Sequence, residues 1–413
     1  MGDTMKRLEK LLRDEGGNAL VTVLVVVALL IVLGTLSLNS TIGELQVSGN
    51  EKRQRLAFYA AESGLEYARA VIRREFLAAT NKNTFVSNFA TSPPSFTAPS
   101  GISFTVAPNG AASGSGTSSD PYVFRVLSEG FGPFNSAAGI EAVFNLVLPD
   151  APIKYAAFGD ELVQFKNKAD IYSYDHTVTT NPTPGASTGE GDIFSNGAID
   201  IKNNGTIDGD LKVASTAITL GAVTVLGDSS TLNDLENPDP LGLLNSGLLA
   251  SRFTAATVAN NNSDPAISPY ISGTALNVNT TVTLPAGDYY FTSIDLGTGA
   301  NILTTGNVNI YLDGPLTTKS TTQINISGIP TDFSIYSRSN QTLDFQNNTN
   351  FRGLIYAPNA SVIFKNNLNL YGSVFANIVE FQNGGTIYYD TQMKYKFFNP
   401  NDIHLPIVAW RQL

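Results

Sequence analysis

The stretch Phe345-Gln-Asn-Asn-Thr-Asn-Phe-Arg-Gly353 decides the fold of this chain, because the sequence repeats it. Close copies begin at Phe364 (FKNNLNLYG) and Ile201 (IKNNGTIDG), and looser copies begin at Phe381 (FQNGGTIYY) and Phe165 (FKNKADIYS). The last three copies along the chain recur at about 17–19 residues. This spacing is typical of the coils of an irregular solenoid.

Each copy carries apolar residues at its first and seventh positions, and we expect these side chains to point inward. The Asn pairs favour turns, including left-handed ones, and stacked Asn side chains form hydrogen-bonded ladders between coils. Short strands such as Asn307–Leu312 and Asp332–Ser337 lie between the copies. We therefore predict a parallel β-helix over residues 151–392. The alternative, an antiparallel sandwich, would need hairpin turns instead of a ladder period.

The repeat is interrupted once, over residues 229–270, and it stops before the C-terminus. Four leucines in the interruption predict a short helix that covers one side or one end of the solenoid: Leu241, Leu243, Leu244 and Leu248. Residues 393–413 are expected to be a C-terminal cap or tail. Within them Ile407–Leu413 (IVAWRQL) resembles a closing strand.

The composition limits the class of protein. Of 413 residues, 36 are Gly, 20 are Pro and only 15% are charged, which argues against a cytosolic helical protein. Hydrophobic (42%) and aromatic (10%) residues are sufficient for a core, so wholesale disorder is not expected. A net charge of −10 without a basic patch gives no reason to expect nucleic acid as a partner. The lack of Cys rules out a disulfide framework, a thiolate metal site and a Cys nucleophile.

The N-terminal region carries an apolar run, Ala19–Leu38, directly behind a charged segment that ends in a Gly pair. At ~1.5 Å rise per residue the run spans ~30 Å, the thickness of a bilayer's hydrocarbon core. It is too long for a secretory signal, and no A-x-A-like cleavage site follows it. The nearest basic cluster precedes it, which favours an N-terminus inside and the bulk of the chain outside.

A helical pattern continues beyond the apolar run and ends near Phe76. Apolar residues recur there at spacings of three and four, on one face of a helix: Phe58, Ala61, Leu65, Ala68, Ile72 and Phe76. Glu51 with Arg55, and Glu66 with Arg69, supply favourable pairs on the polar side. The pattern fits an assembly helix, and it fits equally well a stalk that joins a membrane anchor to a domain.

A charged leader ending in Gly, an apolar helix and a long amphipathic continuation resemble a type IV prepilin. Residues 49–68 (GNEKRQRLAFYAAESGLEYA) are similar to the N-terminal domain of PilX-type minor pilins, and the resemblance covers residues 13–78. It implies a leader over 1–17, cut by a prepilin peptidase between Gly17 and Asn18. It also implies a transmembrane and amphipathic assembly helix over 18–78.

Four positions of that helix are singled out as assembly residues: Thr22, Phe58, Glu62 and Leu65. Major pilins carry a Glu at mature position five, where it pairs with a neighbour's terminal amine. Counted from Asn18 that position is Thr22, which is neutral and offers no such charge. The resemblance therefore implies a minor subunit that sits at a filament tip or primes assembly.

The middle segment, residues 79–150, is loop-rich. Short strands are expected around Ile102–Val106, Tyr122–Ser128 and Ile140–Leu148. They could form a small sheet packed on the amphipathic helix, as in a pilin head, or the cap of the β-helix. Further on, Phe351–Ala360 (FRGLIYAPNA) resembles the β-helical domain behind PilX-type N-termini and, more distantly, the solenoid of ice-binding proteins.

Evidence for catalysis is weak. His176 follows Asp175 and His404 follows Asp402 by two residues, but the sequence holds no nucleophile elbow. Asp208-Gly-Asp210 lacks the ligand spacing of an EF-hand loop, so we interpret it as a turn. We expect no enzyme, no cofactor and no metal site.

The sequence thus predicts a mainly β protein with one long N-terminal α-helix, a small pilin-like sheet and a parallel β-helix. The predicted function is that of a minor pilin-like structural subunit of a type IV pilus, with other pilins, the prepilin peptidase, the assembly platform and the inner membrane as partners. The alternative is a surface adhesin, or a glycan- or ice-binding module on a membrane anchor. A β-helical polysaccharide-acting enzyme ranks last, because basic residues are sparse over 151–390.

Overall fold

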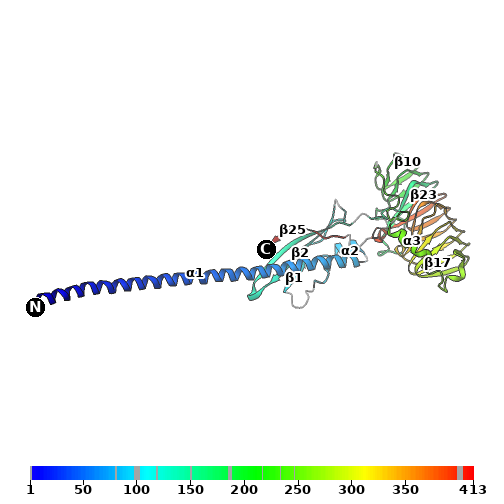
Figure 1. Ribbon diagram of the computed structural model, residues 1–413. Coiled ribbons are helices and arrows are strands. Elements are labelled where there is room, and N and C mark those ends of the chain that lie inside the picture. The colour runs from blue at the N-terminus through cyan, green and yellow to red at the C-terminus, as the bar shows by residue number, and fades with distance from the viewer. Residues whose placement is uncertain are drawn as a thin grey trace. The chain divides into compact units, whose positions relative to one another are not determined.

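The computed structural model forms two compact units, Met1–Leu148 with Ile403–Leu413, and Pro149–Asp402 (Figure 1). The side chains of residues 2–18 and 169 are not described. The structure describes residues 2–79, 81–96, 103–117, 120–148, 151–184, 188–215, 217–232, 234–245, 247–397 and 403–413.

The first unit is built on one long helix, α1 (Gly2–Ala78). Its second half buries the predicted face, which confirms the helical pattern: Ala61, Leu65, Ala68, Ile72 and Phe76 are at most 4% exposed. Phe58 lies at the margin of this face and is half-buried. The predicted ion pairs also form, with Arg69 2.6 Å from Glu66 and Arg55 4.0 Å from Glu51.

A four-stranded antiparallel sheet covers that face in the order β1-β2-β3-β25. The strands are β1 (Phe104–Pro108), β2 (Tyr122–Phe131), β3 (Ala137–Leu146) and β25 (Ile407–Gln412), with a 3₁₀ turn, η1 (Pro133–Asn135), between β2 and β3. Ser128 donates a 2.8 Å hydrogen bond to the carbonyl oxygen of Ala61. The approach is so close that a Cβ on Gly130 would lie 2.1 Å from the Ala57 carbonyl oxygen.

Two features of this unit differ from expectation. A short helix, α2 (Lys82–Ser87), lies where we predicted loop, because the Asn81 side chain caps it by accepting a hydrogen bond from the Thr84 N–H. The second feature is the C-terminal stretch, for which we expected a cap or tail without naming its partner. Its strand β25 pairs with β3 of the small sheet, which gives the tail a neighbour more than 250 residues earlier in the chain.

The second unit is a parallel β-helix with three faces, because long strands turn corners and pair with three different strands. β22 (Asn350–Phe364) pairs with β19 through its start, β20 through its middle and β21 through its end. The corner after the start of β22 requires positive φ, which Gly353 adopts at 155° and the stacked Gly372 at 138°. A Cβ on Gly372 would lie 2.0 Å from the Gly353 carbonyl oxygen, which explains the Gly that ends the repeat.

The strands fall into three groups. The acidic face consists of β14 (Ala275–Val278), β16 (Ser293–Leu296), β18 (Leu316–Thr318), β21 (Leu343–Phe345), the ends of β22 and β23 (Leu368–Phe381), the end of β4 (Ala157–Phe165), β7 (Ala198–Ile201) and β10 (Ala217–Leu220). The polar face consists of the starts of β15 (Thr281–Phe291), β17 (Asn301–Leu312), β22 and β23, with β19 (Gln323–Ile324), β24 (Gly385–Asp390), β5 (Ala169–Tyr174), β8 (Gly205–Ile207) and β11 (Val223–Val225). The aromatic face consists of the ends of β15 and β17, β20 (Phe333–Ser337), the middles of β22 and β23, the start of β4, β6 (Ile193–Ser195), β9 (Leu211–Val213) and β12 (Ser229–Thr231).

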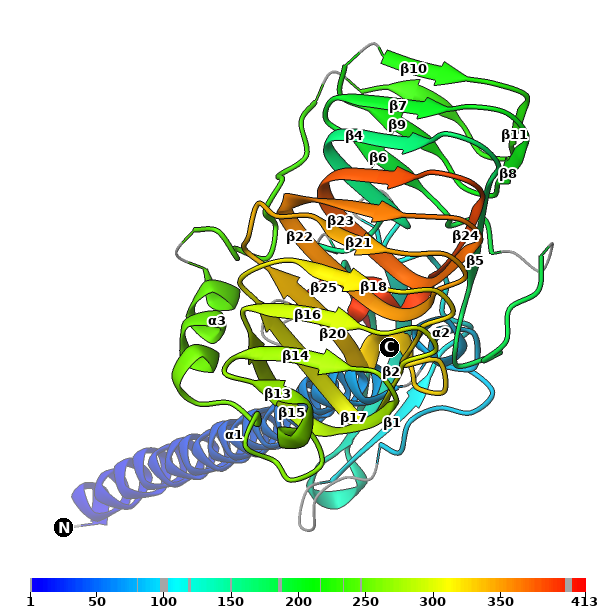
Figure 2. The same cartoon turned by 90° about the vertical axis from the view of Figure 1, so that its right-hand side faces the viewer.

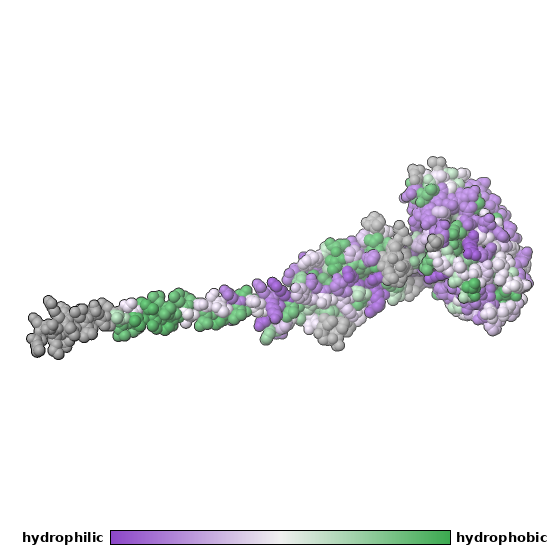
Figure 3. Space-filling model, viewed as in Figure 1, coloured by the Kyte–Doolittle hydropathy of each residue, from purple (hydrophilic) through white to green (hydrophobic). Residues whose placement is uncertain are grey.

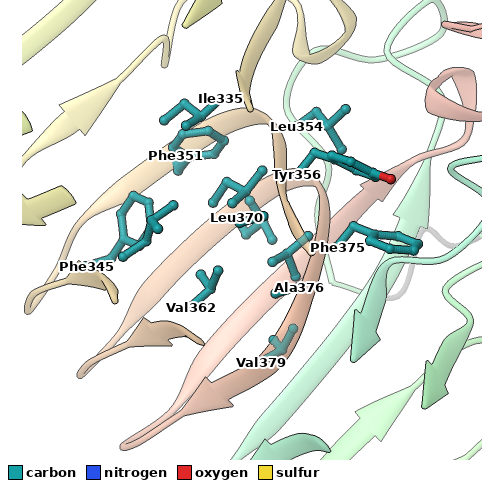
Figure 4. Close-up of a cluster of buried hydrophobic side chains, with 14 of the residues drawn as sticks. Ile335, Phe345, Phe351, Leu354, Tyr356, Val362, Leu370, Phe375, Ala376 and Val379 are labelled. Carbon is teal, nitrogen blue, oxygen red and sulfur yellow. The ribbon is translucent and has the colours of Figure 1, made fainter. Parts of the chain in front are cut away.

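The repeat residues behave as predicted. At all five copies the first and seventh side chains are completely buried: Phe165 and Ile171, Ile201 and Ile207, Phe345 and Phe351, Phe364 and Leu370, Phe381 and Ile387. Figure 4 shows several of them pointing into one cluster. Asn348 and Asn367 are left-handed, each with φ of 56°, and the Asn366 amide donates to Asn347 at 2.7 Å. The predicted turns and Asn ladder are therefore confirmed.

The coils do not stack in sequence order, which the repeat did not predict (Figure 2). The chain enters the middle of the solenoid at β4 and builds outward to β10–β12. Residues 232–270, the crossing segment, then lead to the opposite end, from which β14–β24 build back. Finally Phe381 of β23 stacks on Phe165 of β4, and Ile387 of β24 on Ile171 of β5.

The crossing segment covers a row of rings on the aromatic face. It contains α3 (Leu248–Val258), whose Phe253 packs edge-on against Tyr311 with ring centroids 5.4 Å apart. Of the four leucines that predicted a helix, only Leu248 lies in it, as its first residue, and the other three precede it. The Asp239 carboxylate accepts hydrogen bonds from the backbone N–H groups of residues 243 and 244, so this stretch is a turn and the helix starts later.

The remaining elements are short. β13 (Ile271–Ser272) pairs antiparallel with β14. The 3₁₀ turns of this unit are η2 (Ser268–Tyr270), η3 (Pro330–Asp332) and η4 (Thr391–Tyr395).

Candidate functional site

The first half of α1 is an exposed apolar surface. Leu20, Leu24 and Leu30 are each more than 60% exposed, and none of the apolar residues of Ala19–Leu38 is buried. Figure 3 shows hydrophobic residues gathered on this part of the helix. By length and composition, α1 is the one described helix that could cross a membrane. Such a surface is stable only against lipid or other apolar helices.

The two processing residues and Thr22 all lie within α1. Gly17 and Asn18 are part of its helical backbone, and their side chains lie outside the described part of the structure. Thr22 is exposed on the apolar surface. The cleavage between Gly17 and Asn18 therefore stays a prediction.

The other three assembly residues meet in one groove of the first unit. Phe58, Glu62 and Leu65 line a groove of about 650 Å³ together with Tyr59, Ser63, Glu66, Ile140, Ile407 and Trp410. The rings of Trp410 and Phe58 lie 6.3 Å apart, and Trp410 is 60% exposed. Glu62 is exposed at the rim. The groove is thus an apolar floor with a carboxylate on its edge.

Sequence reasoning missed the side of this groove that the sheet supplies. Trp410 and Ile407 come from β25, which reaches the helix only because it pairs with β3. The single Trp, at the end of the apolar run Ile407–Trp410 near the C-terminus, was the available signal. It identified a strand without identifying the sheet that the strand joins.

The polar face of the β-helix carries an ordered row of side chains. In successive coils the row consists of Thr224, Thr206, Asp170, Thr386, Asn369, Asn350, Gln323, Asn301 and Thr281. The Asn369 amide donates to Asn350 at 2.8 Å, and the Asn350 amide donates to Gln323 at 3.1 Å. Neighbouring coils are spaced ~4.8 Å apart, so the row offers hydrogen-bonding groups at that repeat.

His176 takes part in a buried ion pair. Its Nδ1 lies 2.6 Å from Oδ2 of Asp390, whose side chain is fully buried. Burial lowers the pKa of His176, but the hydrogen bond and charge of Asp390 outweigh it, with a smaller contribution from Asp175, so the pKa is raised overall. Gln392 donates to Asp175 at 2.9 Å. The group ties the end of β5 to η4.

These carboxylates could surround a cation, since the ligand atoms of Asp175, His176 and Asp390 lie within 4.8 Å of one another. However, each carboxylate already accepts hydrogen bonds from protein groups. Asp390 accepts from the His176 and Gln392 backbones, and Asp175 accepts from Thr177. The donor set therefore fits a structural tie better than a metal site.

The other candidate residues are also used structurally. Asp208 accepts hydrogen bonds from the Ser173 N–H at 2.6 Å and from its hydroxyl at 2.8 Å, and Asp210 accepts from the Asp228 N–H at 2.8 Å. Burial raises the pKa of Asp208, and the hydrogen bonds from Ser173 oppose that rise. His404 forms a backbone bridge with Val147, and its expected companion Asp402 lies outside the described residues.

Family models match two parts of the chain. Residues 299–395 match a domain of unknown function (DUF7305), and residues 16–66 match the PilX N-terminal domain. Comparison with curated proteins gave no match.

Several solved structures are similar at low identity. The competence-associated pilin ComZ from Thermus thermophilus is 13% identical, with 87% of this chain and 97% of that chain covered and a TM-score of 0.38. An ice-binding protein from an Antarctic biological consortium is 15% identical, with 59% and 90% covered and a TM-score of 0.34. The DUF3494 domain of an ice-binding protein from Shewanella frigidimarina is 14% identical, with 60% and 99% covered and a TM-score of 0.31.

The matched residues 16–66 contain the whole apolar surface of α1 and all six groove residues that α1 supplies, among them the predicted Phe58, Glu62 and Leu65. The N-terminal helix of this chain is accordingly a PilX-type minor pilin N-terminal domain, as its sequence predicted.

Proposed function

We propose that this chain is a minor pilin-like subunit of a type IV pilus or related filament, which carries its β-helix outside the cell. One observation carries the proposal: a PilX-type helix leaves its first half apolar and uncovered while its second half packs in a folded unit. A membrane covers such a surface before assembly, and the helices of other pilins cover it within a filament. The proposed role is structural rather than catalytic.

The proposal includes an orientation and two processing partners. The N-terminus lies in the cytoplasm, α1 crosses the inner membrane once, and the prepilin peptidase cuts between Gly17 and Asn18. The assembly platform then moves the subunit into the filament, at its tip or during priming. Thr22 supports the minor role, because it offers no charge to a neighbour's amine.

Mass spectrometry of the mature N-terminus tests this proposal. In cells with an active prepilin peptidase, we expect a chain that starts at a methylated Asn18. Gly17→Leu should leave the leader attached, whereas Leu36→Ala, a matched change in the exposed apolar run, should leave cleavage intact. A chain that still starts at Met1 in such cells, with the natural sequence, would refute the pilin proposal.

A second candidate function, binding of a periodic ligand, is favoured by the polar row. A polysaccharide or a crystalline surface such as ice presents groups at regular intervals, as this row does. We expect Thr386→Lys to reduce binding to insoluble polysaccharide or to abolish thermal hysteresis, because it disrupts the middle of the row. Thr317→Lys on the acidic face is the matched control, and equal losses in both variants would contradict a role for the row.

A further inference from the structure

The two ends of the β-helix are finished differently. At the β14–β15 end, the outer edges are hydrogen-bonded. β13 pairs with β14, and the Asn262 side chain bonds both the N–H and the carbonyl oxygen of Tyr290 in β15. The Asn261 N–H donates to the carbonyl oxygen of Asp288, and the Tyr270 hydroxyl donates to that of Thr281. This end is capped by the chain itself.

The opposite end has no such cap. Its last coil consists of β10, β11 and β12, which pair with β7, β8 and β9 on their inner sides. In the described part of the chain, no strand pairs with their outer edges, and Figure 2 shows β10 as the terminal strand there. Three parallel rows of backbone N–H and carbonyl groups therefore face outward around one open end.

The sequence of this coil lacks the usual protection of exposed edges. Natural edge strands are defended by Lys, Pro, bulges or covering segments. Residues 217–232 (AITLGAVTVLGDSSTL) contain one charged residue, Asp228, and no Pro. Leu220, Leu226 and Leu232 are 39%, 66% and 45% exposed. An uncharged, β-prone edge of this kind is stable in solution when another surface covers it.

We infer that this end is an interface for a second copy of the chain, stacked end to end on the first. A single peptide strand could satisfy one edge only, whereas another open solenoid end presents three edges in the same arrangement. A two-fold axis perpendicular to the β-helix reverses every strand, so the facing edges pair antiparallel. Because the opposite end is capped, the contact closes as a dimer instead of growing into a fibre.

The charge of the open end is also compatible with a second copy of the chain. The last coil carries a single charged side chain, Asp228, and the Asp228 N–H donates a hydrogen bond to the Asp210 carboxylate of the preceding coil. The exposed leucines of one end meet those of the other. The inference does not depend on leader cleavage or filament assembly, since both partners need only the folded β-helix.

Light scattering of the full chain in detergent tests the interface. We expect a concentration-dependent dimer in the natural chain. Thr219→Lys with Thr224→Lys should weaken it roughly tenfold or more, because like charges then oppose each other across the paired edges. Thr281→Lys is the matched control, since Thr281 ends the same polar row at the capped end and is also exposed. A dimer that survives the double substitution would overturn the inference and assign association to α1.

Disulfide trapping provides a second readout that does not rely on disruption. The natural chain has no Cys. We make one Cys variant for the middle of each edge strand, Thr219→Cys, Thr224→Cys and Ser230→Cys, with Thr281→Cys as the control. A two-fold axis places one of the three strands opposite its own copy, so at least one variant should form a disulfide-linked dimer under mild oxidation. Three variants that cross-link no better than the control would refute the interface.

Discussion

At the scale of single residues, His176 connects two parts of the β-helix that lie far apart in the sequence. Its pair with Asp390 joins the residues that follow β5, early in the unit, to the end of β24, late in the unit. The attraction of Asp390 raises the pKa of His176 above its usual value near 6.5. The pair is therefore strongest when His176 is protonated.

The His176–Asp390 pair predicts that the stability of the folded protein falls as the pH rises. Below the unfolded pKa, His176 is protonated in both states and the stabilisation is fully present; it is lost as the pH rises through the raised folded pKa. We expect the melting temperature to decline from pH 6 through the folded pKa, and the decline to vanish in His176→Gln. Thermal unfolding across this range measures it, and an identical pH profile in the variant would contradict the prediction.

Removal of the acidic partner should cost more than a change of pH. Asp390→Ala leaves His176 and two backbone N–H groups without their acceptor in a buried site, with an expected loss of about 3 kcal/mol. Asp344→Ala is a suitable control, since that carboxylate is only partly buried, with its side chain 23% exposed, and pairs with Lys365. Chemical denaturation gives the loss in free energy of unfolding for both variants. Equal losses would show that the His176–Asp390 pair contributes no special stability.

Gly130 fixes the distance between α1 and the small sheet. A Cβ there would lie 2.1 Å from the Ala57 carbonyl oxygen, whereas on Gly139 the nearest atom is the Leu413 side chain at 3.3 Å. We expect Gly130→Ala to destabilise the first unit by about 2–3 kcal/mol through overpacking and Gly139→Ala to have a small effect. Comparison of the two melting curves tests this difference.

At the scale of elements, α3 owes its place to the aromatic face that it covers. Phe253 is fully buried between Tyr290 and Tyr311, while Leu248 in the same helix is 71% exposed. The sequence indicated a helix in this segment, but three of the four leucines that indicated it lie in the turn before the helix. The decisive side chain is a Phe whose partners lie in strands 37 and 58 residues away.

We expect Phe253→Ala to lower the free energy of unfolding by about 3–5 kcal/mol, because it leaves a cavity over the aromatic row. Leu248→Ala is the matched control and should change it by less than about 0.5 kcal/mol, as a surface position does. Urea titrations of both variants measure the difference. A Phe253→Ala loss as small as that of the control would show that α3 is not needed to cover this face.

At the scale of the whole molecule, the coil order predicts where the β-helix is most protected. β4, β5, β23 and β24 are central in the stack although they lie at the two ends of this unit's sequence. Terminal coils of a solenoid open more easily than central ones. In the Thr219→Lys, Thr224→Lys variant, hydrogen exchange should be slow in these four strands and fast in β10–β12. Equally fast exchange in β4 and β10 would contradict the coil order.

The sequence by itself determined the coils, the long helix and the inward residues. Phe345 and Phe351 had to be buried because the first and seventh positions of the repeat both point to the inside of each coil. Asn348 had to turn because Asn tolerates a left-handed backbone. These are local effects, visible in spacing and residue type. Only the tertiary structure decided that Phe381 stacks on Phe165 and that β25 joins β3 beside Phe58. Backbone edges pair through the same N–H and carbonyl groups whatever their side chains, so sequence does not specify which edges meet across hundreds of residues.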